Sequence, residues 1–449
     1  MVTFDDVLPT LVRVIEESSV AATIRRAGVV RDLEGRVRLI IEPDPSQPIP
    51  DMSALEQALV QALQRWIEPP LLMTTDLREP GRLARALMGK SNIQWPDARY
   101  VQSSTLQEVP ATPGRWNKIE RRLSKYDWVR DERATPPWPL REGSPPIVTF
   151  YSFKGGVGRT TLLASCAWQL AELGKKVVVV DLDVEAPGLS ALFEVESRRG
   201  VVDFLVDFIG TGQIDMDGLV SAPGSLGPLK GNIEVVTAGN LDERYFEKLS
   251  RLDFIGGGLL DVKGESPVER GLRHLLGALR GRQADYIFID SRAGLHDIAG
   301  LSLHGLAHVD VFVSRASEQG YRGLELTLQA LGRRKKVDDL LCVVAHSLAP
   351  PDPASQEAKI EEEEFLKRAY RAFDQSLYGK LPESPQLEDD EEPHWPKVIR
   401  RHPLLERLTH LGAAREVLFS EGYKQLLERI VELCEPEEDV ESTSEEGIQ

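Results

Sequence analysis

The residues best suited to chemistry lie in one stretch, residues 147–161, which reads IVTFYSFKGGVGRTT. Residues 147–151 are β-branched and aromatic, which predicts a buried strand, and residues 160–173 carry apolar side chains at helical spacing. The glycines between them let backbone N–H groups converge on an anion, and the helix N-terminus adds partial positive charge. The order of strand, glycine turn and helix predicts a phosphate-binding loop, with Lys154 and Arg159 as its cations.

Carboxylates follow two further apolar runs of the sequence. The valine-rich run of residues 176–181 ends at Asp181, with Asp183 two residues later, and a second apolar run ends at Asp290. Ligands of open α/β sheets bind outside the carboxyl ends of the parallel strands. We therefore expect these aspartates beside the loop, where their oxygens and the Thr160 hydroxyl suit Mg²⁺. The alternative for the first pair is a capped turn with solvated carboxylates.

The string KGGVGRTT at residues 154–161 resembles the deviant phosphate-binding loop of the ParA/MinD ATPase family, in its variant with arginine in the loop. It departs from the general pattern, Gly-x4-Gly-Lys-[Ser/Thr], because Phe153 stands at the first glycine and Arg159 at the lysine. The resemblance covers residues 147–434 and does not reach residues 1–146.

The sequence after Asp290 is similar to the second switch of the same family, Asp-Ser-Pro-Ala-Gly. Arg292 replaces the proline, which adds a cation near the expected phosphates. The resemblance implies an α/β fold: a mostly parallel, doubly wound P-loop NTPase sheet, beside a smaller N-terminal α/β or α+β domain.

The resemblance also implies a role for each site residue. Lys154 would reach across a nucleotide-sandwich homodimer to the partner's phosphates and, with Arg159, stabilise charge on the transferred group. Asp183 would place the attacking water, which makes these three residues catalytic. Thr160 and Asp290 would hold Mg²⁺, and Asp181 would organise the metal side. The implied ATP-binding residues are Lys154, Gly155, Gly156, Val157, Gly158, Arg159, Thr160 and Thr161.

The composition is that of a globular protein in a reducing compartment. The chain has 449 residues, 41% of them hydrophobic and 28% charged, and three scattered cysteines that we expect to be buried thiols. No apolar run approaches membrane-spanning length, and the membrane-targeting helix of MinD proteins is not evident, so we expect a cytoplasmic location without membrane binding. A net charge of −17 disfavours nucleic-acid binding without excluding a local basic patch.

The chain divides into five predicted segments. In order, they are an N-terminal regulatory or interaction domain (1–131), a proline-rich linker (132–146), the NTPase domain (147–434) with a charged helical insertion (350–396), and an acidic disordered tail (435–449). In the first domain, residues 4–15 and 52–67 have helical spacing and residues 37–41 suggest a strand.

Two basic stretches have more than one interpretation. Residues 115–128 predict a basic helix, which would pack its aromatic and apolar side chains inward or bind nucleic acid or a partner; the spacing favours packing. Residues 333–336 (RRKK) suit a helix C-terminus or a phosphate-backbone contact, and the former is favoured.

The remaining pattern predicts the rest of an α/β domain. We expect strands at 233–236, 285–290, 309–313, 340–345 and 398–403, and helices at 269–280, 318–331, 355–373 and within 404–433. His346 and His402 are predicted to be loop histidines without a catalytic role. No base-reading asparagine is evident at residues 345–348, so adenine selectivity is less secure than phosphate binding.

The resemblance, together with these patterns, implies a nucleotide-dependent, dimerising ATPase that couples ATP binding and slow hydrolysis to assembly with a protein partner. The partner would bind the N-terminal domain or residues 350–396. The competing hypothesis is a nucleotide-sensing scaffold that does not hydrolyse ATP, in a multi-protein bacterial system such as defence or stress signalling. A bacterial tyrosine kinase ranks low because no tyrosine follows Tyr423.

Overall fold

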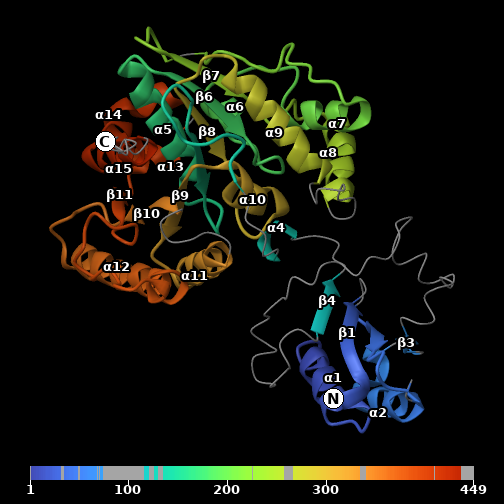
Figure 1. Ribbon diagram of the computed structural model, residues 1–449. Coiled ribbons are helices and arrows are strands. Elements are labelled where there is room, and N and C mark those ends of the chain that lie inside the picture. The colour runs from blue at the N-terminus through green and yellow to red at the C-terminus, as the bar shows by residue number, and fades with distance from the viewer. Residues whose placement is uncertain are drawn as a thin grey trace, which may run out of the picture. The chain divides into compact units, whose positions relative to one another are not determined.

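The computed structural model describes twelve stretches of the chain (Figure 1). They are residues 2–31, 35–48, 51–67, 69, 71–73, 116–120, 126–129, 135–224, 226–256, 266–333, 340–408 and 410–435. The chain divides into two compact units, residues 1–123 and 124–449, called here the N-terminal and the C-terminal unit. The predicted acidic tail beyond Glu435 and most of the basic stretch at 333–336 lie outside the described residues.

In its described residues, the N-terminal unit forms a four-stranded mixed sheet in the order β3-β2-β1-β4, packed with the two helices α1 and α2. β1 pairs antiparallel with β2 and parallel with β4, and β2 pairs parallel with β3. This confirms the expected small α/β or α+β domain. The elements are α1 (Val7–Glu16), β1 (Ile24–Arg31), β2 (Val37–Pro43), α2 (Ser53–Leu63), β3 (Leu72–Met73) and β4 (Trp116–Glu120), with 3-10 turns at Ala21–Thr23 and Gln64–Trp66.

The basic helix predicted at residues 115–128 is wrong. Among the described residues of this stretch, Trp116–Glu120 form strand β4 and Tyr126–Val129 form the short helix α4. β4 pairs with β1, about ninety residues earlier in the chain, from Ala27↔Trp116 onward. The backbone hydrogen-bonding groups of these residues pair with those of strand β1. Local periodicity carries no information about so distant a partner.

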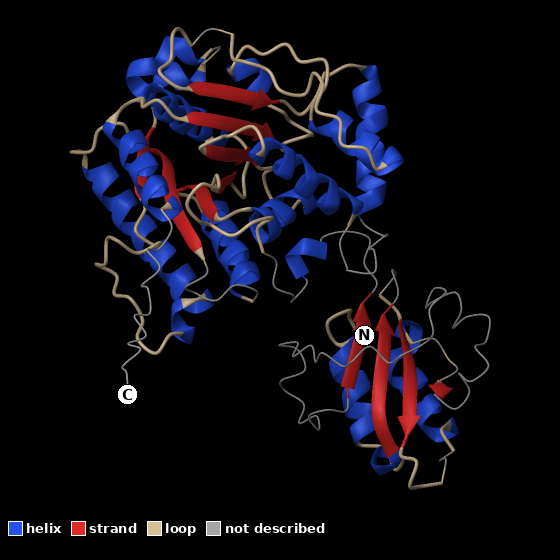
Figure 2. Ribbon diagram, turned by 45° about the horizontal axis from the view of Figure 1, so that its top comes forward, coloured by secondary structure: helices blue, strands red, loops and turns tan. Residues whose placement is uncertain are grey.

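The C-terminal unit contains a seven-stranded sheet whose order is β11-β10-β9-β5-β8-β6-β7. Every neighbouring pair is parallel (Figure 2), which confirms the predicted fold class. The strands are β5 (Ile147–Tyr151), β6 (Lys176–Asp181), β7 (Asn232–Val236), β8 (Tyr286–Asp290), β9 (Val309–Arg315), β10 (Leu341–Ala349) and β11 (Lys397–Arg400).

Helices cover both faces of this sheet because side chains alternate between faces along each strand. Val148 and Phe150 face the core formed with α5, α14 and α15, whereas Ile147 and Tyr151 face the opposite layer. The helices are α5 (Arg159–Glu172), α6 (Leu189–Leu192), α7 (Val201–Thr211), α8 (Glu243–Gly256), α9 (Pro267–Arg280), α10 (Asp297–Leu301), α11 (Glu318–Gly332), α12 (Gln356–Ser376), α13 (Pro403–Glu406), α14 (Arg415–Leu418) and α15 (Glu421–Cys434). Shorter turns occupy Ser302–Leu306, Tyr378–Lys380 and Leu411–Ala414.

Helix α12 packs against the large sheet and α11, although its sequence suggested a charged insertion. Phe365, Ala369, Ala372 and Phe373 form a buried stripe on α12, which packs with α11 and with strand β10. The many acidic and basic residues of the helix lie on its other faces. Because they dominate its composition, the buried apolar stripe was not recognised from the sequence. The outer face keeps Ile360 57% exposed.

The proline-rich segment before β5 is fastened to the sheet. The indole of Trp138 is 5% exposed and donates to Pro145 O. Buried His308 accepts from the backbone N–H of Ile147 at 2.8 Å and donates to Trp138 O at 2.7 Å. The described part of the predicted linker is therefore packed structure.

Cys166, Cys342 and Cys434 are buried free thiols, as expected. Among the helices that the structure describes, none has the length and apolar character needed to span a bilayer.

His346 lies in strand β10 and is buried, so the prediction of a loop histidine is wrong. Its ring stacks on Phe365 with centroids 4.1 Å apart, and Nε2 donates to Glu361 at 3.2 Å. Burial, together with the positive charge of Arg400, lowers the pKa of His346 to about 4.

This lowered pKa predicts a loss of stability in acid. The unfolded chain takes up a proton near pH 6.5 whereas the folded protein resists it until about pH 4, so stability falls as the pH drops between these values. Between pH 7 and 5 the loss attributable to His346 is about 2 kcal/mol. Urea unfolding at both pH values measures it. His346→Phe, which keeps a stacking ring, should lose correspondingly less, and an equal loss in both proteins contradicts the assignment.

Candidate functional site

The loop between β5 and α5 presents unbonded backbone N–H groups. Gly156 and Gly158 adopt φ values of +73° and +84°, which turn the chain so that α5 begins at Arg159. The N–H groups of residues 155–160 donate to no acceptor in the described chain, and a Cβ added at Gly155, Gly156 or Gly158 would meet no atom within 4 Å. The loop is thus an open anion cradle at a helix N-terminus.

Phe153, at the position of the usual first glycine, is used for packing. Its ring lies against the backbone of α11 at Gly323, where an added Cβ would approach the ring to 2.2 Å. Only glycine fits there, so this departure from the general loop pattern reflects a packing contact with α11 beside the loop.

Arg159 is a buried cation held by two aspartates. Its side chain is 7% exposed, Nε donates to Asp290 Oδ1 at 2.5 Å, and NH2 donates to Asp183 Oδ2 at 2.7 Å. Burial alone would lower the pKa of Arg159, but the Asp290 and Asp183 carboxylates outweigh it and raise this pKa above its ordinary value. The guanidinium fork therefore joins the start of α5 to the ends of β6 and β8.

Thr160 and Asp290 form the pair of oxygens best suited to Mg²⁺. The Thr160 hydroxyl donates to Asp290 Oδ2 at 2.7 Å. Within the described residues, no group of three or more His, Cys, Asp or Glu side chains is placed to hold a metal ion. This donor set fits Mg²⁺, which commonly takes one or two protein oxygens and completes its shell with phosphates and water.

Asp181 is occupied by backbone donors. It is fully buried and accepts from the N–H groups of Asp183, Gly188 and Leu189, all at 3.1 Å. Burial, reinforced by the charge of Asp290, raises the pKa of Asp181. The residue shapes residues 182–188, called here the first loop, and this geometry makes it a support of the site.

A second set of ion pairs joins the first loop to residues 291–296, called here the second loop. Arg292 donates to Asp183 Oδ1 at 3.2 Å and pairs with Glu185. The His296 ring contacts Glu185 at 3.1 Å. Asp183 therefore has an arginine on each carboxylate oxygen.

Of the residues predicted for the site, the structure brings Arg159, Thr160, Asp183 and Asp290 into direct contact. Lys154 stands apart: it is exposed and has no hydrogen bond or ion pair in the described chain. The ion pairs of Glu185 and His296 were not predicted. Glu185, in the run DVEAPG (183–188), was the available signal in the sequence. Its partners Arg292 and His296 lie more than 100 residues away along the chain.

Comparison with known proteins identifies relatives of the C-terminal unit. The family model of the CobQ/CobB/MinD/ParA nucleotide binding domain matches residues 148–395. An uncharacterised ATP-binding protein of Methanocaldococcus jannaschii is 49% identical over 53 residues, 12% of this chain and 20% of that protein. The septum site-determining protein MinD of Helicobacter pylori is 32% identical over 165 residues, 37% of this chain and 50% of that protein.

The chain thus spans about a fifth to a half of the length of these curated relatives. Among solved structures, the cell division ATPase MinD of Pyrococcus furiosus is 20% identical. The match covers 64% of this chain and 99% of that one, with a TM-score of 0.42.

Removing the buried cation tests the charge balance of the site. Arg159→Met leaves the carboxylates of Asp183 and Asp290 without their shared partner, and we expect it to lower the free energy of unfolding by about 3 kcal/mol without nucleotide. Urea denaturation measures this loss. Arg322→Met, which removes an arginine with 69% exposure, should change stability by less than about 1 kcal/mol. Equal losses in the two variants contradict a special role for Arg159.

Proposed function

The chain belongs to the CobQ/CobB/MinD/ParA nucleotide-binding family, and we propose that it is an ATPase that binds ATP with Mg²⁺ and hydrolyses it slowly. The proposal is carried by one arrangement, in which the unbonded N–H groups of residues 155–160 lie beside the Thr160–Asp290 pair. A cradle of amides at a helix N-terminus recognises phosphate oxygens, and the adjacent hydroxyl and carboxylate suit the cation that accompanies them.

We assign the chemical roles as follows. Residues 154–161 bind the phosphates. Mg²⁺, when bound by Thr160 and Asp290, supplies neutralisation of the phosphate charge. Asp183 orients the attacking water through its carboxylate. Arg159 stabilises charge on the transferred group by exchanging a carboxylate partner for a phosphate oxygen, since arginine can grip either bidentately.

A nucleotide-sensing scaffold without hydrolysis is the second candidate, and one observation favours it. Both oxygens of Asp183 accept from arginines, Oδ2 from Arg159 and Oδ1 from Arg292. Two arginine donors leave this carboxylate with fewer free lone pairs and neutralise its charge, which weakens its ability to orient water and favours binding without turnover.

Substitution of Asp183 separates the two candidates. For an ATPase, we expect Asp183→Asn to lower the turnover number at least about 100-fold while a fluorescent ATP analogue binds within about threefold of wild type. Asp207→Asn, at an exposed ion pair with Arg199, should leave both quantities unchanged. Phosphate release and equilibrium titration measure them. A wild-type protein that binds nucleotide tightly and releases no phosphate supports the scaffold.

We also propose a nucleotide-dependent homodimer, in which Lys154 reaches the phosphates bound by the partner subunit. Its exposure and its lack of a partner in the described chain support this role. The dimer would then bind another protein through residues 1–131 or through residues 350–396.

Light scattering after size-exclusion chromatography tests the dimer. Wild type should change from monomer to dimer when Mg²⁺ and a non-hydrolysable ATP analogue are added, and Lys154→Ala should stay monomeric. Lys424→Ala, which removes another exposed lysine of the same unit, should dimerise as wild type does. Dimerisation of the Lys154→Ala variant contradicts the role of this lysine.

A further inference from the structure

The short helix that follows the N-terminal unit is docked beside the second loop. α4 contacts α10, which begins directly after this loop. Trp128 of α4 is 5% exposed and packs in one cluster with Tyr151, Ala299 and Leu303. Its ring centroid lies 6.0 Å from that of Tyr151, at the end of the strand that leads into the phosphate loop.

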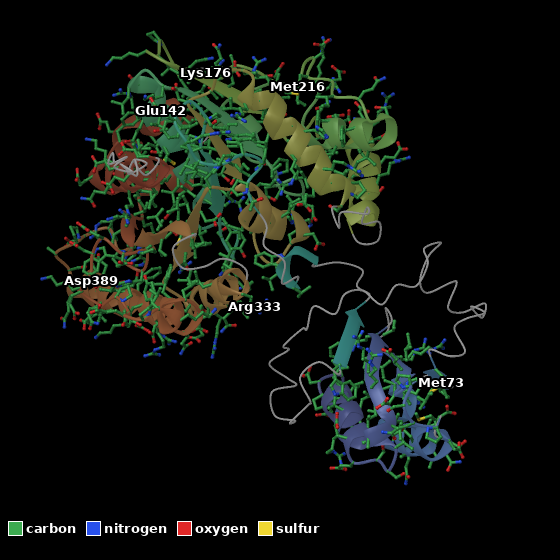
Figure 3. The ribbon with its side chains drawn as sticks, viewed as in Figure 1. Met73, Glu142, Lys176, Met216, Arg333 and Asp389 are labelled. Atoms are coloured by element: carbon green, nitrogen blue, oxygen red, sulfur yellow. The ribbon has the colours of Figure 1, made fainter. Side chains whose placement is uncertain are left out.

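Two hydrogen bonds fix this tryptophan. Its indole Nε1 donates to the backbone oxygen of His296, the last residue of the second loop, at 2.7 Å. Arg333, labelled in Figure 3 at the end of α11, donates to the backbone oxygen of Trp128 at 3.0 Å. The indole and the main chain of Trp128 are thus both bonded to distant residues of the C-terminal unit.

The second loop connects this attachment to the chemistry of the site. Gly294 donates to Ser152 O at 3.0 Å and accepts from the Tyr151 hydroxyl at 3.2 Å. At one end of the loop the His296 ring contacts Glu185, and at the other Arg292 binds both Glu185 and Asp183. A shift of His296 would therefore displace Glu185 and Arg292, and through Arg292 it would move Asp183, the residue proposed to orient water.

We propose that Trp128 is a positioning residue. It couples helix α4, which follows the N-terminal unit and is called here the tether, to the nucleotide state of the site. This inference rests on the proposed function. The Trp128–His296 bond stabilises the arrangement in which Arg292 pairs with Asp183 and Arg159 holds Asp290. Phosphate oxygens compete with these carboxylates for Arg159 and Arg292, and the metal competes with Arg159 for Asp290, so binding of both loosens the second loop and the contacts that hold α4. Coupling of this kind is reciprocal: release of α4 strengthens nucleotide binding by the same factor.

The experiment compares two tryptophans of the same unit. Trp128→Phe keeps a buried ring and loses the donor to His296 O, and we expect the full chain to bind a non-hydrolysable ATP analogue with Mg²⁺ about fivefold more tightly, as one ordinary hydrogen bond implies. Trp138→Phe is the matched control, since Trp138 is equally buried and also donates its indole N–H to a backbone oxygen, away from both loops. It should leave the affinity unchanged.

Hydrogen exchange supplies a readout that a purely structural role does not move. In wild type, the amides of α4 should exchange faster with the analogue than without it, whereas in Trp128→Phe the exchange should be fast in both states. Arg333→Gln breaks the second attachment at an exposed side chain, and we expect it to raise nucleotide affinity in the same direction even if Trp128→Phe folds poorly.

The outcomes separate the two proposals. Nucleotide binding by wild type that neither Trp128→Phe nor Arg333→Gln alters, with equal α4 exchange in both states, overturns the coupling and leaves the proposed function intact. A wild type that binds no nucleotide overturns the proposed function and the coupling with it.

Discussion

The arrangement of the site depends on one guanidinium group placed between two buried carboxylates. Three aspartates converge at the carboxyl ends of β6 and β8, and such a cluster is tenable away from water only when it is paired or protonated. Arg159 supplies the pairing with two nitrogens directed to Asp183 and Asp290, whereas backbone amides satisfy Asp181. A lysine in its place is a point charge without this planar fork. Arg159, which the general phosphate-loop pattern does not contain, thus connects the phosphate-binding loop with the first loop and with the end of β8.

The sheet explains why these groups meet. Asp181 and Asp290 are register partners on the adjacent strands β6 and β8, and Phe150 of β5 is the partner of Asp290 on the other side. Each strand delivers its last residue to the same edge, so residues far apart in sequence come within hydrogen-bond distance. Hydrogen bonds then fix the loops that follow the strands. Tyr245 of α8 donates to Val184 O in the first loop, and Gly294 of the second loop donates to Ser152 O after β5. A parallel sheet of this kind provides a rigid base, and the mobile part of the chemistry falls to the loops.

The sequence predicted the strands of the large sheet, the helix after the loop and four of the contacting site residues, because these follow from local periodicity and from motif order. Where tertiary partners decide, the prediction failed. The ladder between β4 and β1 replaced a predicted helix, since its partner strand is distant in the chain. His346 was assigned to a loop because β10 continues past its apolar run to a residue with positive φ, Leu348. The pairs of Glu185 with Arg292 and His296 follow from folding of two loops onto each other, which no spacing encodes.

Two anchored tryptophans also bear on how the protein would respond to mechanical load. Trp128 and Trp138 are both fixed in the C-terminal unit, ten residues apart and just after the N-terminal unit ends. Along the chain that leaves the N-terminal unit, Trp128 comes before Trp138, so a pull would act first on the bonds of Trp128 with His296 O and Arg333, while the second anchor and His308 protect strand β5. Tension would therefore be borne by the second loop before the sheet, so a partner that strains the tether would alter the site without unfolding the domain.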